Sequence, residues 1–255
     1  MSVPLRLSVL DQSPLTGDAG PADALARSLD LARQADSLGF HRVWFAGHHR
    51  SGSFAGTSPE TMAAPALERT SRIRAGSGRV GSGRVGSGGI LLPRHRPDKV
   101  AETMGILAFV HPGRVDVGIG RGGGPAADFD RKVSDLRGLL LDAAAGSADP
   151  GEPAAHLWLL GAGGSSAPLA GSLGAGYAFG HFFAPSRGRA VLAGYRAHLP
   201  SGAARGGPLL AVRAVAAADP ERAAALARAM LLWRARKDLG TDAPVPSLAA
   251  LDRHV

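Results

Sequence analysis

The 255-residue chain contains no cysteine. Disulfide bonds, thiolate metal sites and cysteine nucleophiles are therefore excluded, and several enzyme classes with them. Long apolar runs are also missing, because Arg, Asp, Gly or Pro interrupts every window of the ~18 residues that a membrane-spanning helix needs. The apolar stretch before Asp11 is too short for a secretion signal. We therefore expect a soluble, cytoplasmic protein with no membrane partner.

Lysine is scarce, since only Lys99, Lys132 and Lys237 are present. The net charge of +8 comes from arginines that are spread singly along the chain, and aromatic residues make up only 5% of it. Nucleic-acid binding requires a basic stripe or aromatic side chains on which bases stack, and neither pattern is present. We expect no nucleic-acid partner. The hydrophobic fraction of 45% is typical of a globular chain that buries a sizeable core.

Short apolar runs alternate with amphipathic segments along the chain, which predicts parallel strands separated by helices. About seven βα units favour a TIM (β/α)8-type barrel, shortened at its C-terminus, as a single domain over residues 1–255. The predicted strands are Leu5–Leu10, Arg42–Ala46, a third ending at Leu92, Val115–Ile119, His156–Leu160, Tyr177–Phe179 and Leu209–Val215. The predicted helices are Pro21–Leu38, Ser58–Thr70, Pro97–Val110, Phe129–Leu141, Ser166–Leu173, Arg187–His198 and Pro220–Leu239.

One glycine-rich segment departs from this alternation. The unit Arg-Val-Gly-Ser-Gly occurs twice, beginning at Arg79 and at Arg84. The extra residues exceed what one strand of ~5–6 residues absorbs, so we interpret residues 79–88 as an insertion that is dispensable for stability. The strand is then formed either by Ile73–Ser77 or by Val85–Leu92. A phosphate-binding loop is the alternative interpretation, since glycine-rich turns expose backbone N–H groups.

Three polar segments follow predicted strands, where (β/α)8 barrels carry their chemistry. His48 follows the second strand, and a neutral imidazole there can exchange a proton near pH 7, although spacing alone favours two surface histidines beginning a loop. Arg121 follows the fourth strand, where it is either an anion ligand or a surface arginine beside a flexible loop. The segment Gly161–Ser166 follows the fifth strand and opens a helix. This segment either binds a phosphate or forms an ordinary turn in which a serine caps the helix.

Seven separated motifs occur in order along residues 5–250. They are LSVLDQSPL, ADSLGFHRVWFAGHH, TSPE, IRAGSG with GILLPRHRPDKVAE, HPGRVDVGIGRGGG, LWLLGAGGSSAPLA and YAFGHFFAP. Together they resemble the bacterial luciferase-like flavin-dependent monooxygenase family, and more narrowly its branch of single-chain luciferase-like oxidoreductases. The resemblance implies a (β/α)8 barrel that uses reduced FMN and O2 to oxygenate a small organic substrate. A reduced deazaflavin is the alternative cofactor.

The resemblance also assigns roles to residues. It places the family's active-site histidine at His48 and a contact to the flavin phosphate at Arg121. It also implies that the loop after the fifth strand binds this phosphate. It further implies a homodimer and a separate NAD(P)H:flavin reductase that supplies reduced FMN. No spacing of histidines and carboxylates predicts a metal site. The loop residues assigned to cofactor binding are Gly161, Gly163, Gly164, Ser165 and Ser166.

Two features depart from the family pattern. Gly47 stands where relatives commonly carry glutamate, whose carboxylate could orient His48. After Leu239 the expected eighth strand and helix are replaced by a proline-spaced segment, Asp242–Pro246, and a short tail. A barrel that lacks a strand leaves unpaired edges. These departures keep open a second hypothesis, in which the chain is a degenerate, non-catalytic flavin-binding protein.

Overall fold

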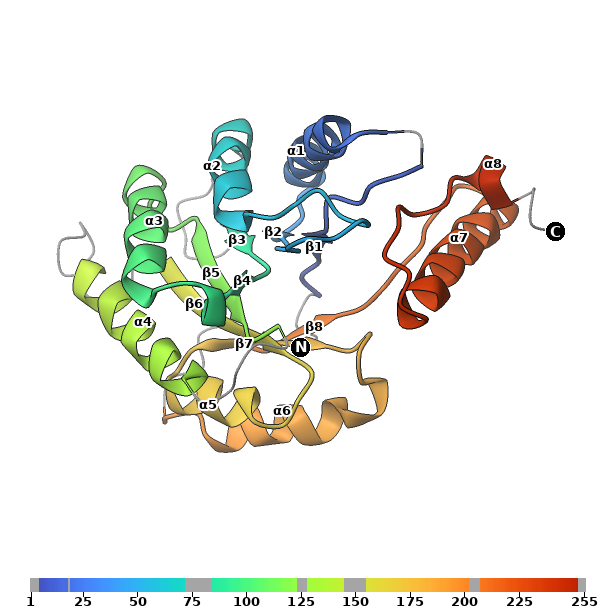
Figure 1. Ribbon diagram of the computed structural model, residues 1–255. Helices are drawn as coiled ribbons and strands as arrows, with labels where there is room; N and C mark the ends of the chain where they lie inside the picture. Colours follow the sequence, from blue (N-terminus) through green and yellow to red (C-terminus); the bar gives the residue numbers. More distant parts are fainter. Residues whose placement is uncertain are drawn as a thin grey trace.

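The structure is a computed structural model that describes residues 5–17, 19–71, 84–122, 128–144, 155–201 and 207–251. Its elements alternate as the sequence predicts (Figure 1). The strands are β1 (Ser8–Asp11), β2 (Arg42–Phe45), β3 (Arg84–Ser87), β4 (Ile90–Leu91), β5 (Val115–Gly120), β6 (Ala155–Gly161), β7 (Gly176–Gly180) and β8 (Leu209–Ala211). The helices are α1 (Pro21–Ser37), α2 (Pro59–Arg69), α3 (Pro97–Val110), α4 (Phe129–Ala144), α5 (Ser166–Ser172), α6 (Gly188–Ala197), α7 (Pro220–Asp238) and α8 (Leu248–Leu251).

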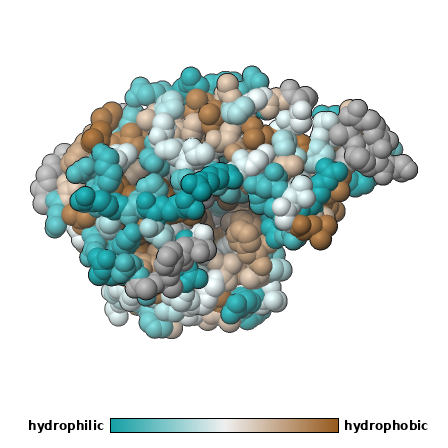
Figure 2. All heavy atoms as spheres, in the orientation of Figure 1, coloured by the Kyte–Doolittle hydropathy of each residue, from teal (hydrophilic) through white to brown (hydrophobic). Residues whose placement is uncertain are grey.

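The strands form one parallel sheet in the order β1-β2-β3-β5-β6-β7-β8, and β4 continues the β3 position by pairing with β5. The sheet curls into a nearly closed barrel with helices around it, which confirms the predicted TIM-type fold. Within the described residues no ladder joins β8 to β1, so the barrel has one open seam. Helices α7 and α8 stand to one side of the barrel, and they project from its main body in the space-filling view (Figure 2).

Two predicted strands are wrong at their ends, and both border the seam. The first strand begins at Ser8 rather than Leu5, and the last ends at Ala211 rather than Val215. Each has a hydrogen-bonding neighbour on one side only, so no second ladder extends it. Leu210 and Val212 are each 56% exposed as a result.

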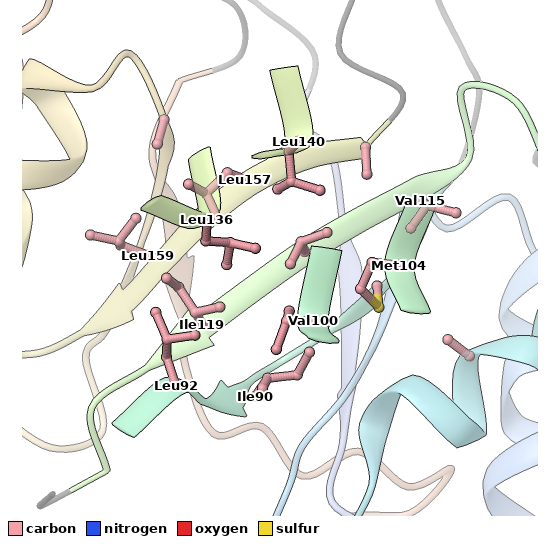
Figure 3. Packing of buried hydrophobic residues seen from close by; sticks show 14 of the residues in the cluster. Ile90, Leu92, Val100, Met104, Val115, Ile119, Leu136, Leu140, Leu157 and Leu159 are labelled. Atoms are coloured by element: carbon pink, nitrogen blue, oxygen red, sulfur yellow. The ribbon is translucent and has the colours of Figure 1, made fainter. Parts of the chain in front are cut away.

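The core lies between the outer face of the sheet and the surrounding helices (Figure 3). Alternate residues of β5 and β6 point outward, as the two-residue period of a strand requires. Their apolar side chains meet those of α3 and α4 in one buried cluster. The residues labelled in the close-up are Ile90, Leu92, Val100, Met104, Val115, Ile119, Leu136, Leu140, Leu157 and Leu159.

The inner face carries a buried ion cluster near the amino-terminal ends of its strands. The Asp116 carboxylate accepts hydrogen bonds from Arg42 Nε at 2.8 Å and from Arg84 Nε at 2.7 Å. Burial opposes ionisation of Asp116, but Arg84 and Arg42 outweigh it and hold the pKa of that carboxyl below its usual value. The Arg42 guanidinium also lies 4.9 Å from the centroid of the Trp158 ring. The cluster ties β2, β3 and β5 together at one register.

The second Arg-Val-Gly-Ser-Gly unit forms β3 and is not an insertion. Val85 is fully buried, and Ser87 Oγ donates to the Gly118 carbonyl at 2.8 Å and accepts from the Gly118 N–H at 2.9 Å. A Cβ on Gly86 would lie 2.7 Å from the Trp44 ring, so only glycine fits there. Of the two strand alternatives left open by the sequence, the structure therefore agrees with Val85–Leu92, and residues 84–87 belong to the strand rather than to an insertion. The first unit and the alternative strand Ile73–Ser77 lie outside the described residues.

These contacts predict different costs for two deletions. Removing residues 79–83 leaves an Arg-Val-Gly-Ser-Gly unit directly before Gly89, so we expect unchanged stability, because loop-closure entropy depends only weakly on length. Removing 79–88 instead brings Arg74–Gly78 to that place, which repeats the unit with Ala75 in the position of Val85. That variant should fold but lose about 2 kcal/mol, because two buried methyl groups are missing.

Urea denaturation measures both effects. Ala75→Val in the ten-residue deletion is the matched control and should restore the lost stability. Equal stability of the two deletions, or no recovery with valine, would show that another segment forms β3 in the shortened chains.

Candidate active site

His48 lies beyond the carboxyl end of β2, on the edge where (β/α)8 barrels place their active sites. Its backbone N–H donates to the Gly56 carbonyl at 2.8 Å, and its ring stacks on Phe54 with centroids 4.1 Å apart. The Nδ1 atom is buried and has no hydrogen-bond partner among the described residues. Burial, together with the charge of Lys237, lowers the pKa of His48 to about 4. The imidazole is therefore neutral at pH 7, with an unused polar atom.

Three loops that are distant in sequence fix the backbone around His48. The Leu15 N–H donates to the Ser53 carbonyl at 2.8 Å, and the Ala55 N–H donates to the Ser13 carbonyl at 2.9 Å. The Val245 N–H in turn donates to the Leu15 carbonyl at 2.8 Å. The loops after β1 and β2 and the segment after α7 thus share one hydrogen-bonded backbone network.

Asp242 anchors the C-terminal segment to the loop after β2. Its carboxylate accepts from the Gly52 N–H at 2.9 Å, from Ser51 Oγ at 3.3 Å, from Lys237 Nζ at 2.8 Å and from the Ser53 hydroxyl. Burial acts to raise the pKa of Asp242, but these hydrogen bonds outweigh it and hold the pKa well below its usual value. Sequence reasoning missed this residue, because its partners in the loop after β2 lie about 190 positions away in the chain.

Helix α7 packs against Phe54, the residue on which the His48 ring stacks. Trp233 is 4% exposed, its Nε1 donates to Ser53 Oγ at 3.0 Å, and its ring meets Phe54 edge-on with centroids 5.5 Å apart. The Lys237 ammonium lies 5.3 Å from the Phe54 ring centroid and 5.7 Å from that of Trp233. The packed rings exclude water from one side of the imidazole, which explains its lowered pKa.

Gly47 sits in a tight place. A Cβ at this position would lie 3.1 Å from Pro59 Cδ and 3.2 Å from the Gly89 carbonyl oxygen. A glutamate would therefore require a shift of a few tenths of an ångström in its neighbours. Glu60, the second residue of α2, offers a different carboxylate, since its Oε2 is buried without a partner among the described residues. Sequence reasoning did not single out Glu60.

Arg121 directly follows β5, and Gly161 ends β6, the strand that pairs with β5. The backbone of Arg121 and the loop after β6 therefore lie at the same edge of adjacent strands. Arg121 is exposed and forms no ion pair with a described residue. The structure thus brings together the two segments predicted to hold a phosphate.

In the loop after β6, some residues are open to solvent and others are held by hydrogen bonds. A Cβ on Gly163 or Gly164 would meet nothing within 4 Å, so the backbone there is accessible. The Tyr177 hydroxyl donates to the Gly161 carbonyl at 3.2 Å and also hydrogen-bonds Ser166. Ser165 precedes α5 but its side chain makes no capping hydrogen bond, so the predicted serine cap is wrong.

Several other groups do not join this site. Glu102 is exposed and pairs with Lys99 at 3.5 Å, and no described side chain bonds the ring of His181. No group of three or more His, Asp or Glu residues in the described ranges is arranged to hold a metal ion. Among the helices described, none is both long and apolar enough to cross a membrane.

The packing of His48 predicts its titration. In histidine NMR spectra we expect the ring to remain neutral down to about pH 4. Lys237→Met should raise this pKa, because it removes a cation and leaves the negative charge of Asp242 uncompensated. Lys99→Met, at an exposed pair elsewhere, is the control. Titration of His48 near pH 6.5 would show instead that the ring is solvated.

The same shift has a consequence for stability. The unfolded state binds more protons than the folded state between about pH 4 and 6.5, because the folded pKa is the lower one. The contribution of His48 to stability therefore falls as the pH falls through this window. His48→Gln should flatten the pH dependence of the urea midpoint there, and an unchanged slope would contradict the burial of the ring.

Comparison with known proteins places this arrangement in a family. Residues 5–137 match the family described as luciferase-like monooxygenase. The uncharacterized protein YceB of Bacillus subtilis is 34% identical over 98% of this chain and 80% of its own length. The N-acetyl-S-alkylcysteine monooxygenase of the same organism is 30% identical over 78% of this chain and 64% of its own length.

Solved structures agree with the fold. The crystal structure of apo-MsnO8 matches with a TM-score of 0.84 and 33% identity, over 98% of this chain and 79% of that one. The oxygenating constituent of 3,6-diketocamphane monooxygenase from Pseudomonas putida, solved in complex with FMN, shares the fold with a TM-score of 0.59 at 17% identity, over 94% of this chain and 80% of that one. The chain thus spans most, but not all, of the length of these relatives, and it belongs to the luciferase-like monooxygenase family.

Proposed function

We propose that the protein is a flavin-dependent monooxygenase that uses reduced FMN and O2 to oxygenate a small organic substrate. The observation that carries the proposal is His48, a neutral imidazole whose buried Nδ1 lacks a partner at the carboxyl edge of the barrel. A polar atom left unpaired in this way costs free energy in the resting fold, which is typical of a functional position. Membership of the family supports the same reaction class.

The residues present fit a flavin phosphate. Arg121 offers a guanidinium without a carboxylate partner among the described residues, and a guanidinium binds a phosphate bidentately. Gly163 and Gly164 offer accessible backbone on the neighbouring strand's loop, and Ser165 has a hydroxyl that caps no helix. We propose that Arg121, Gly161, Gly163, Gly164, Ser165 and Ser166 hold the phosphate. When bound, reduced FMN supplies the electrons that activate O2.

The chain's own contribution to the reaction is proton handling and exclusion of water. His48 would accept or donate the proton through its imidazole, which is neutral at pH 7. Phe54 holds the ring in one orientation, and Trp233 covers Phe54 in turn. Asp242 holds these rings in place, because its carboxylate accepts hydrogen bonds from the loop that carries Phe54.

The proposal includes two protein partners, a flavin reductase and a second copy of this chain. Reduced FMN would come from a separate NAD(P)H:flavin reductase in the cytoplasm, as in the family that the chain belongs to. A homodimer is supported by α3, whose last turns expose Ile106, Phe109 and Val110 at 62%, 52% and 63%. Apolar side chains that cluster on one exposed helix are typical of a subunit interface.

A second candidate function is non-catalytic flavin binding, or hydride transfer with a reduced deazaflavin on the same fold. Gly47 favours the non-catalytic alternative, because it supplies no carboxylate to orient His48. Titration with FMN and with a deazaflavin cofactor separates the cofactors. Oxygen consumption separates an enzyme from a binding protein.

We expect NADH-fuelled oxygen consumption when a flavin reductase and FMN are added together with a substrate. His48→Ala should fold and bind FMN normally but lower substrate oxygenation by ~10²–10⁴, because proton transfer is impaired. His48→Gln controls for side-chain volume. Full oxygenation by both variants would remove His48 from the mechanism, and flavin binding without any turnover in the parent would favour the non-catalytic alternative.

Arg121→Ala should weaken FMN binding by about 1.5–3 kcal/mol, the value of one charge-assisted hydrogen-bonding contact. Riboflavin, which lacks the phosphate, should bind both proteins alike. Fluorescence titration measures both affinities. FMN affinity that changes by less than twofold would exclude the phosphate role.

A further inference from the structure

A cavity of about 450 Å³ opens at the amino-terminal end of the barrel, away from the candidate active site. Ala155 and Gly176, the first residues of β6 and β7, belong to its lining. The loop predicted to bind a phosphate follows the other end of β6, and a strand of seven residues spans about 20 Å. The volume is typical of a site for a small molecule.

The wall of this cavity is mostly apolar. Helix α4 contributes Leu140 and Leu141, β6 contributes Leu157, and the segments after α5 and α6 contribute Leu173 and Pro200. Leu140 and Leu157 also belong to the buried core, so packing fixes this part of the wall (Figure 3). Leu141 remains 43% exposed and is free to contact a ligand. The cavity therefore suits a molecule with an aliphatic body.

Arg137 on α4 brings a positive charge to this apolar wall. It is half-buried, and its Nη2 atom lies 3.8 Å from the point that a Cβ on Gly174 would occupy, at the turn between α5 and β7. Burial lowers the pKa of Arg137, but a guanidinium stays protonated in proteins. Among the described residues the side chain has neither an ion pair nor a hydrogen-bond partner. Its N–H donors are available to a ligand.

The surrounding charges also favour an anion. No aspartate or glutamate is among the described residues that line the cavity. His156 lines it and is neutral at pH 7, because burial and the charge of Arg84 lower its pKa to about 4. The register partner of His156 on β5 is Asp116, whose single carboxylate pairs with both Arg84 and Arg42. This ion cluster therefore has an excess positive charge close to the cavity, in addition to that of Arg137.

We propose that the cavity binds an apolar carboxylate, with its carboxyl group on the Arg137 guanidinium and its aliphatic chain against Leu141, Leu173 and Pro200. The planar guanidinium matches a carboxylate with two parallel hydrogen bonds, and the leucines match an alkyl chain. This is a second binding site, distinct from the carboxyl edge. It does not depend on the proposed function, because none of the residues predicted to bind the flavin lines the cavity.

Calorimetric titration of the full chain with octanoate and with the neutral octanamide tests the assignment. We expect Arg137→Gln to weaken octanoate binding by at least tenfold and to change octanamide binding by less than twofold. Arg137→Lys should retain part of the octanoate affinity. Leu141→Glu should weaken octanoate more than octanamide, because a carboxylate four residues after Arg137 on one helix competes for the guanidinium. Arg131→Gln, at an exposed pair on the same helix, is the control and should change neither affinity.

Amide NMR signals locate the ligand. In the parent protein, octanoate should shift the signals of Gly174 and Gly176 and leave those of Gly163 and Gly164 unchanged. The proposal is overturned if octanoate does not bind, if it shifts only the second pair of glycines, or if Arg137→Gln leaves its affinity unchanged. Equal weakening of octanoate and octanamide in Arg137→Gln also overturns it, because the arginine would then only shape the cavity.

Discussion

The carboxylate of Asp242 joins the C-terminal segment to the loop after β2, and the arrangement of the candidate site depends on this junction. Because no ladder joins β8 to β1 in the described residues, the sheet alone does not hold α7 against the barrel. Four donors on Ser51, Gly52, Ser53 and Lys237 converge on one carboxylate instead. This contact brings Trp233 onto Phe54, and Phe54 onto His48, so the properties of the imidazole follow from a residue far away in sequence.

Charged side chains lie at both ends of the barrel, and they differ in burial. At the amino-terminal end of the strands, Asp116 neutralises Arg42 and Arg84 in a buried cluster that fixes the register of β3. At the carboxyl edge, Lys237 pairs with Asp242, whereas Arg121 has no carboxylate partner among the described residues. Paired charges at one end stabilise the fold, since a buried ion needs a counterion. The unpaired guanidinium of Arg121 at the other end suits an anionic ligand.

The order and nature of the elements could be predicted from the sequence, because apolar periodicity and turn residues are local properties. Helix α3 matches its prediction at both ends, and α1, α7 and β2 lie within one residue of theirs. The strands at the seam differ, since the length of a strand depends on its neighbours. The glycine-rich repeat leaves two strand alternatives open in the sequence for a similar reason. Its two units are identical in sequence, and only the contacts of Trp44, Asp116 and Gly118 show that one of them forms β3.

The sequence by itself determined the family, the barrel and the positions of His48, Arg121 and the loop after β6, because each follows a strand and short motifs carry that information. The tertiary structure alone decided which groups surround them. No local pattern indicates a site at Asp242, which lies in a proline-spaced segment, or at Trp233 and Lys237, which lie on an arginine-rich helix. They converge because parallel strands bring their carboxyl ends to one edge, and because hydrogen bonds between loops about 190 residues apart close that edge.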